Sequence, residues 1–137
     1  MRRLLVDTGV LYALTDPSDQ YHKRAQQEAL TIELEGWQIF LTPPVMLEAH
    51  ALVLKKLGHK VARRWLAEVR VGTGPLSVLA EDYDVAVDLV AKFNDQKITL
   101  FDATLAALSM RLDLPVWTYD RDFDILGIQV WRPLDTL

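Results

Sequence analysis

The sequence has no cysteine, no long apolar run and no glycine-rich phosphate loop. Without cysteine, a disulfide scaffold, a thiolate metal site and a cysteine nucleophile are all excluded. No apolar run approaches the ~20 residues that span a bilayer. The basic start meets an acid, Asp7, after only three apolar residues, which is unlike a secretory signal. The three histidines lack the paired spacing of a zinc site. We therefore expect a cytoplasmic protein that does not associate with membranes.

The chain has 137 residues, of which 50% are hydrophobic and 25% charged, an ordinary globular composition. This length predicts one domain that covers residues 1–137. The formal net charge is −4, from 15 basic and 19 acidic residues, which is opposite to the balance of a strongly cationic nucleic-acid binder. A local basic patch can still attract a polyanion. Basic residues do gather in one stretch of the chain, at Lys55, Lys56, Lys60, Arg63 and Arg64.

Short apolar runs alternate with longer segments of helical periodicity. The pattern predicts strands at 4–6, 38–41, 76–79, 115–118 and 128–131, a turn at 72–75, and helices at 10–14, 21–35, 42–57, 59–71, 81–94 and 99–112. Strands that are separated by helices pair in parallel through crossover connections. The sequence therefore predicts an α/β fold, a three-layer α/β/α domain with a central, mostly parallel sheet of about five strands. Ligands of such sheets bind beyond the carboxyl ends of the strands.

Two acids occupy positions in the first half of the chain where apolar residues are expected. Asp7 directly follows the first apolar run, where an aspartate can also cap the next helix. Glu48 interrupts the apolar stripe of its predicted helix. An unpaired buried carboxylate costs several kcal/mol or takes up a proton. Glu48 therefore has a basic partner or a metal, unless it reaches water at the edge of the stripe.

Further acids follow in the second half. Asp102 lies three residues after Thr99, a spacing typical of a helix capping box, on a helix whose small residues predict close packing on the sheet. Asp120 comes just after the predicted strand 115–118, and Asp122 and Asp124 follow it. These last three acids could instead form an acidic loop in solvent.

Asp7, Glu48, Asp102 and Asp120 come from four separate segments, which a parallel sheet would bring together at one crevice. Clustered carboxylates repel one another and hold raised pKa values unless a cation neutralises them. Hard oxygen ligands favour Mg²⁺ or Mn²⁺ over zinc, and magnesium is commonly bound by one or two carboxylates together with substrate phosphate. The residues alone therefore suggest a metal-dependent phosphodiester hydrolase.

Four segments, in this order and spacing, resemble the successive motifs of PIN-domain ribonucleases, and in particular the VapC-type toxins of toxin–antitoxin pairs. They are Asp7-Thr8-Gly9-Val10-Leu11-Tyr12-Ala13-Leu14, Glu48 in a helix, Leu100-Phe101-Asp102-Ala103 and Thr118-Tyr119-Asp120-Arg121-Asp122-Phe123. The resemblance covers nearly the whole chain, and the last motif is its most specific part. It implies a parallel-sheet α/β/α fold, in agreement with the pattern of strands and helices.

The resemblance also implies the roles of individual residues. The catalytic and metal-binding acids would be Asp7, Glu48, Asp102 and Asp120, with Asp122 as a further acid and Thr118 as a polar residue beside them. Either Asp120 or Asp122 could supply the last metal ligand. The expected reaction is hydrolysis of RNA by in-line attack with Mg²⁺ or Mn²⁺, leaving a 5′-phosphate and a 3′-hydroxyl. Basic residues beside the site, Lys55, Lys56 and Arg63 among them, would attract the RNA backbone, unless they form only a solvated helix face.

The same resemblance implies a homodimer and a small antitoxin protein that occupies the groove of the site. Three alternatives remain at this point. A phosphatase with Asp7 as nucleophile would need a second acid where the chain has Gly9, and a receiver-like signalling module would need a lysine after a late strand. A housekeeping or degenerate PIN-like domain, which processes or binds RNA without a toxin role, is the third, although all four acids are retained.

Overall fold

A short parallel sheet lies at the centre of the computed structural model, which describes residues 2–72 and 76–134. Its strand order is β2-β1-β3, with β1 at Arg2–Val6, β2 at Trp37–Phe40 and β3 at Val116–Trp117. Both pairings are parallel, as predicted. β1 is central because its second half is wholly apolar, and Leu4, Leu5 and Val6 are at most 1% exposed. The carboxyl end of β1 therefore lies between those of its two neighbours.

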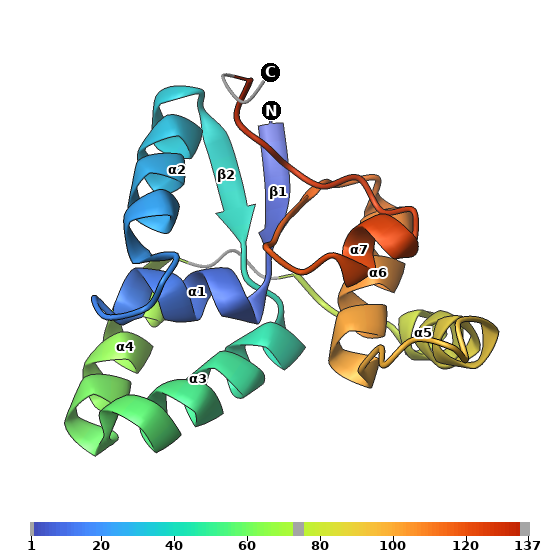
Figure 1. Cartoon of the computed structure of the whole chain (residues 1–137), viewed down its shortest axis with the longest axis horizontal. Helices are drawn as coiled ribbons and strands as arrows, with labels where there is room; N and C mark the ends of the chain where they lie inside the picture. The colour runs from blue at the N-terminus through green and yellow to red at the C-terminus, as the bar shows by residue number, and fades with distance from the viewer. Residues whose placement is uncertain (1, 73–75, 135–137) are drawn as a thin grey trace.

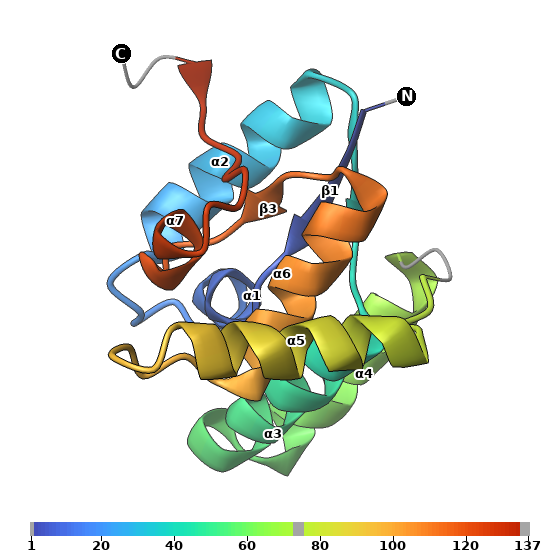
Figure 2. The same ribbon diagram turned by 90° about the vertical axis from the view of Figure 1, so that its right-hand side faces the viewer.

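Helices cover both faces of the sheet and also extend beyond the carboxyl ends of its strands (Figure 1). They are α1 (Thr8–Thr15), α2 (His22–Leu34), α3 (Pro43–Leu57), α4 (His59–Gly72), α5 (Ala80–Lys92), α6 (Leu100–Leu112) and the short α7 (Asp122–Ile125). Figure 1 shows α2 on one side of the strands and α5 and α6 on the other. The quarter turn of Figure 2 brings α5 and α6 in front of β1 and β3, with α2 behind them. The predicted three-layer α/β/α arrangement is thus confirmed.

The helix that carries Asp102 is buried along the middle of its length. Along α6 the residues from Ala103 to Ser109 are all buried. Small side chains such as Ala103 and Ala106, both 0% exposed, allow close packing around this helix. Because Asp102 stands in the first turn of this buried helix, its carboxylate is held near the sheet and not in bulk solvent.

The prediction of about five strands is wrong for the described residues, where three strands form. Segment 76–79 is not a strand, because its backbone groups bind side chains of the helical layer: the Leu79 amide donates to Asp82 over 2.8 Å, and Arg111 donates to the Ser77 carbonyl. Segment 128–131 makes only an isolated bridge, Val130 with Val116, since β3 has just two residues to pair with it.

The remaining boundaries agree closely with the pattern read from the sequence, with one omission. Each of the six predicted helices overlaps one observed helix, but α7 was not predicted, because the acids at its start suggested a solvent loop. Of the predicted turn, residues 73–75 lie outside the described residues, and Gly72 ends α4. In the part of the chain that the structure describes, no helix is both long and apolar enough to cross a bilayer.

Candidate metal centre

Asp7 occupies the junction between β1 and α1, where both of its predicted roles are realised. Its backbone amide donates to the Trp117 carbonyl over 3.0 Å, which ties it to the end of β3. It is the N-cap residue of α1, and one carboxylate oxygen accepts from the Thr8 amide over 2.8 Å. The other oxygen accepts from the Thr118 hydroxyl over 2.7 Å. Only 8% of Asp7 is exposed, so its carboxylate is held rigidly in a largely buried position.

Thr118 links Asp7 to the acids that follow β3. The Asp120 amide donates to the Thr118 hydroxyl oxygen over 3.0 Å, and the Asp122 amide donates to Asp120 Oδ1 over 2.9 Å. Each side chain in this series thus fixes the backbone two residues further on. The result is a tight turn from β3 into α7, and Thr118, predicted to lie beside the site, is buried within it.

Asp102 reaches the same place from the first turn of α6. Thr99 caps α6, its hydroxyl accepting from the Asp102 amide over 3.1 Å, so the predicted capping pattern is present. One carboxylate oxygen from each of Asp102, Asp120 and Asp122 can be chosen so that all three lie within 4.8 Å of one another. Capping and a place in the acidic cluster are therefore compatible for Asp102.

The acids predicted from four separate segments line one open pocket of about 670 Å³. Asp7, Glu48, Asp102 and Asp120 all contribute to its wall. Glu48 is half-buried and faces the pocket from α3. Asp122 belongs to the tight group of three carboxylates described above.

Burial and mutual repulsion raise the pKa values of the innermost acids. The pKa of Asp7 rises to about 6, first through desolvation and then through the charges of Asp120 and Glu48, against the hydrogen bond from Thr118. The pKa of Asp102 rises to about 7, again mainly through burial, with Asp7 and Asp120 adding to it. Burial and the charge of Asp120 also raise the pKa of Asp122. Such shifts in a pocket indicate a functional site, because a folded protein gains no stability from crowding like charges.

The chemistry of the donors fits a hard divalent cation. The pocket presents carboxylate and hydroxyl oxygens, with no histidine among its lining residues, which favours Mg²⁺ or Mn²⁺ over zinc. Thr8 also lines the pocket, and its buried hydroxyl has no hydrogen-bond partner within the part of the chain that is described. A cation in this pocket would offset the burial and the repulsion that raise the pKa values of Asp7 and Asp102, and its water could satisfy Thr8.

The predicted RNA-attracting residues divide into two groups. Lys55 lines the pocket from α3. Lys56 lies over the ring of Tyr12, with its ammonium 5.0 Å from the ring centroid, and Arg63 is exposed on α4 outside the pocket lining. Of the three, Lys55 is placed to meet a ligand of the pocket directly.

One buried acid close to the pocket was missed by the sequence interpretation. Glu28 in α2 is only 6% exposed. Its carboxylate accepts from Trp117 Nε1 over 3.1 Å and from the Tyr119 hydroxyl over 2.6 Å. The signal was present, because Glu28 stands between the buried Ala25 and Ile32, at helical spacing of three and four residues.

Comparisons with known proteins agree with this architecture. The family model described as "PIN domain" matches residues 4–128. Among solved structures, the chain is similar to the sarcin-ricin loop cleaving toxin VapC20 of Mycobacterium tuberculosis, with a TM-score of 0.81 and 21% identity over 95% of this chain and 99% of that chain. No match to a protein of curated function reaches significance.

Two further solved structures share the fold at lower sequence identity. VapBC2 from Rickettsia felis, bound to a DNA fragment from its promoter, has a TM-score of 0.72 at 12% identity. FitAcB from Neisseria gonorrhoeae has a TM-score of 0.67 at 19% identity. In both comparisons the alignment covers 95% of this chain and 97% of the other.

Proposed function

The chain belongs to the PIN-domain family, and from that premise we propose that it is a metal-dependent endoribonuclease, which hydrolyses RNA phosphodiester bonds as the toxin of a toxin–antitoxin pair. The observation that carries the proposal is the pocket at the carboxyl end of β1, where acids from four segments converge. Hydrolysis of a polyanion in such a pocket requires a cation, since bare carboxylates repel phosphate.

In this proposal Asp102, Asp120 and Asp122 hold Mg²⁺ or Mn²⁺ together with Asp7, and Glu48 faces them from α3. When bound, the ion lowers the pKa of an attacking water and stabilises the charge that develops on the scissile phosphate. Asp7 acts from a fixed position, because the Thr8 amide and the Thr118 hydroxyl hold its two oxygens.

The remaining residues act on water and RNA. Glu48, half-buried on the opposite wall of the pocket, orients the attacking water and accepts its proton. Lys55, which lines the pocket from the same helix, attracts the RNA backbone to the site. Asp120 and Asp122 are coupled by the hydrogen bond between the Asp122 amide and Asp120 Oδ1, so the turn after β3 places both together.

The toxin role is supported by the names of the structural neighbours, which include a sarcin-ricin loop cleaving toxin and a toxin–antitoxin complex from Klebsiella pneumoniae. By analogy, we propose a small antitoxin protein as partner of this chain and a homodimer as its assembly. Expression with the product of a neighbouring short reading frame, followed by size-exclusion chromatography with light scattering, tests both. A monomer that does not bind that product would favour a housekeeping role.

The activity is tested by mapping cut RNA ends. Purified protein is incubated with structured RNAs and Mg²⁺ or Mn²⁺, and the products are sequenced. We expect discrete cuts that leave 5′-phosphates, no cuts in excess EDTA and none with Asp102→Asn, whereas Asp84→Asn, an exposed position on α5, should cut normally. Undiminished cleavage in EDTA would overturn the metal-dependent mechanism.

A further inference from the structure

A second hollow, of about 220 Å³, opens next to the acidic pocket and is rich in arginine. Three arginines line it, Arg24 from α2 together with Arg121 and Arg132, and we call it the arginine hollow. Tyr119 and Asp120 line both this hollow and the acidic pocket. A strand of nucleic acid that places one phosphate at Asp120 would therefore continue directly into the arginine hollow.

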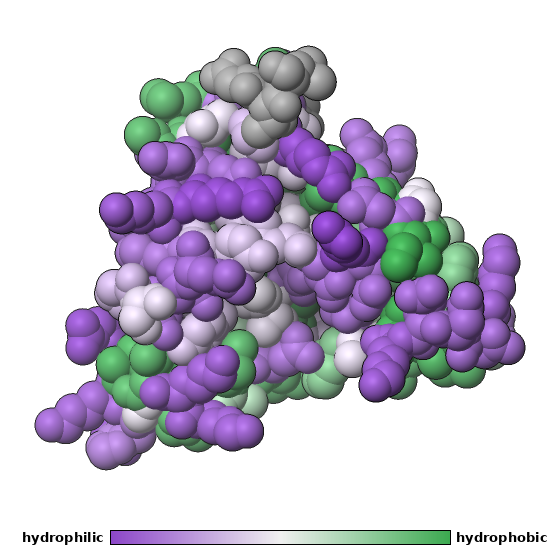
Figure 3. All heavy atoms as spheres, in the orientation of Figure 1, coloured by the Kyte–Doolittle hydropathy of each residue, from purple (hydrophilic) through white to green (hydrophobic). Residues whose placement is uncertain are grey.

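The carboxylates near the hollow do not neutralise all of its arginines. Asp124 lines the hollow and pairs with Arg132, 3.0 Å apart. Asp120 belongs to the proposed metal site. Arg121 is exposed at the start of α7, and it has no ion-pair partner within residues 2–72 and 76–134. Figure 3 shows many hydrophilic side chains over α2 and α7 on this face of the molecule, beside some hydrophobic ones, so a polar ligand can approach.

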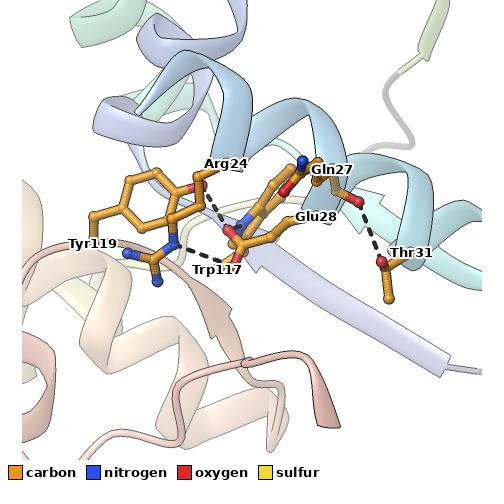
Figure 4. A network of polar contacts seen from close by, with 6 residues as sticks. All are labelled: Arg24, Gln27, Glu28, Thr31, Trp117 and Tyr119. Atoms are coloured by element: carbon orange, nitrogen blue, oxygen red, sulfur yellow. Dashed lines mark hydrogen bonds and ion pairs between the residues drawn. The ribbon is translucent and has the colours of Figure 1, made fainter. Parts of the chain in front are cut away.

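Arg24 is held in place more firmly than a surface arginine normally is. Its guanidinium lies over the ring of Tyr119, 4.4 Å from the centroid, and its Nε lies 3.4 Å from Glu28 Oε2. Glu28 is itself fixed, since its other oxygen accepts from the Tyr119 hydroxyl and from Trp117 Nε1. Figure 4 shows the two terminal nitrogens of Arg24 pointing away from Glu28.

This arrangement has the features of an anion-binding group that is ordered before its ligand arrives. Half of the Arg24 side chain is exposed, at 51%, although its Nε contacts Glu28 and one face of its guanidinium lies on the Tyr119 ring. The free N–H groups of a planar guanidinium match the paired oxygens of a phosphate. Because Glu28 and Tyr119 already restrict its rotamers, Arg24 loses little conformational entropy on binding.

We propose that the arginine hollow binds the RNA backbone phosphate next to the scissile one, with Arg24 as the main substrate-binding residue and Glu28 as the positioning residue that holds it. This inference rests on the proposed function, because it assigns the path of the RNA away from the acidic pocket. Lys55 attracts RNA on the α3 wall of that pocket, and the arginine hollow extends the path past Tyr119 and Asp120.

Binding of a fluorescein-labelled single-stranded RNA of mixed sequence tests the proposal. Fluorescence anisotropy is measured over a range of salt concentrations with Ca²⁺ in place of Mg²⁺, so that a cation neutralises the carboxylates of the pocket, and a gel checks that the RNA stays intact. Arg24→Gln should weaken binding about tenfold and reduce the magnitude of the slope of log K against log salt by about 0.7, the loss of one phosphate contact to a single strand. Lys23→Gln, an exposed neighbour in the same helix, is the matched control and should leave the slope unchanged.

Further variants separate binding from folding. Arg121→Gln alters an exposed residue of the hollow and should also reduce the slope, even if Arg24→Gln lowers stability. Arg24→Lys keeps the positive charge but loses the planar set of N–H donors. It should therefore retain the salt slope and bind RNA with an affinity between those of the wild type and Arg24→Gln. Glu28→Gln should weaken RNA binding. The circular dichroism of Glu28→Gln and of Tyr119→Phe should remain native, which would show that both variants fold. A merely structural role for Arg24 would lower the melting temperature and leave the salt slope unchanged.

The possible failures are distinguishable. If Arg24→Gln and Arg121→Gln bind with the affinity and salt slope of the wild type, while the wild type cuts RNA in Mg²⁺, the arginine hollow is not a phosphate site and the proposed function stands. If the wild type neither binds nor cuts any RNA, both proposals fail together.

Discussion

Asp7 and Glu28, two buried carboxylates that both lie beside β3, have opposite electrostatic surroundings. Asp7 is 8% exposed and Glu28 is 6% exposed, so both pay nearly the full cost of leaving water. Glu28 accepts from Trp117 and Tyr119 and pairs with Arg24, so a cation and two donors compensate its charge. Asp7 receives two hydrogen bonds but no cation from the described residues, and the charges of Asp120 and Glu48 oppose its ionisation.

This is the difference that we expect between a carboxylate that stabilises the fold and one that a bound cation neutralises, which is the role proposed for Asp7. Asp82 extends the comparison, because it is 2% exposed and Arg111 holds it through two hydrogen bonds that lower its pKa. Asp82 and Glu28 satisfy the rule that buried charges are paired. Asp7 does not satisfy this rule, and proteins tolerate an unpaired buried charge at sites where a bound ligand neutralises it. The comparison therefore makes opposite predictions for substitutions in the two places.

Asp7→Asn should give the largest effect and the sharpest test. We expect RNA cleavage to fall more than about a hundredfold, because even outer residues that support a metal ligand contribute about 10- to 100-fold. The free energy of unfolding of the metal-free protein at neutral pH should stay the same or rise, since a crowded buried charge is removed. Cleavage of labelled RNA and urea unfolding in EDTA measure the two quantities.

The control for Asp7→Asn is Asp84→Asn, an exposed position on α5 that should change neither quantity. A variant at Asp7 that loses both activity and several kcal/mol of stability would contradict the comparison. In that case the carboxylate would serve mainly as the N-cap of α1, the alternative that the sequence left open.

Glu28→Ala should have the opposite signature. It leaves Trp117 Nε1, on a side chain that is 1% exposed, and the Tyr119 hydroxyl without their acceptor. Each of these two unsatisfied donors costs on the order of 1–3 kcal/mol, so we expect a loss of about 2 to 6 kcal/mol in urea unfolding. Glu33→Ala, exposed in the same helix, is the matched control and should lie within about 0.5 kcal/mol of the wild type. Equal free energies of unfolding for the two variants would contradict the conclusion that Glu28 stabilises the fold.

The sequence was sufficient to locate the acidic pocket because strand ends are set by simple rules. Leu4-Leu5-Val6 is a short apolar run that favours a buried strand, so we expect the next residue, Asp7, at its carboxyl end, and all three side chains are buried. Parallel pairing then brings the end of β3 beside it, and the Asp7 amide does bind the Trp117 carbonyl. The catalytic and metal-binding roles of these acids stay predictions, whereas their convergence on one pocket is observed.

The parts that sequence reasoning missed depend on contacts between distant residues. Segment 76–79 has the composition of a strand, yet its backbone binds Asp82 and Arg111, which nothing in the local pattern indicates. The arginine hollow is formed by residues from α2, from the start of α7 and from near the end of the chain, far apart in sequence. Glu28 alone carried a local signal, since it interrupts an apolar stripe as Glu48 does.

The smallest expected effect is the pH dependence of the metal-free protein. The pKa of Asp7 is about 6 in the folded state and 3.8 without its burial, so between these values the folded state binds more protons than the unfolded state. Stability therefore falls as pH rises through this window, which is opposite to the behaviour of a salt-bridged acid. For Asp7 alone we expect a loss of about 1 kcal/mol between pH 5 and pH 7, to which Asp102, with its pKa raised to about 7, adds in the same direction.

Urea unfolding in EDTA at a series of pH values measures this slope, and Asp7→Asn should flatten it. Mg²⁺ or Mn²⁺ should restore stability most at pH 7, because the ion binds only the ionised carboxylates and competes with their protons. Paired acids such as Asp82, whose pKa is lowered by Arg111, are ionised in both the folded and the unfolded state between pH 5 and pH 7 and add no slope there. Stability that does not fall from pH 5 to pH 7 in the wild type would therefore mean that Asp7 and Asp102 do not titrate in this window. The contrast between a crowded and a compensated carboxylate would then have no measurable consequence for the stability of the fold.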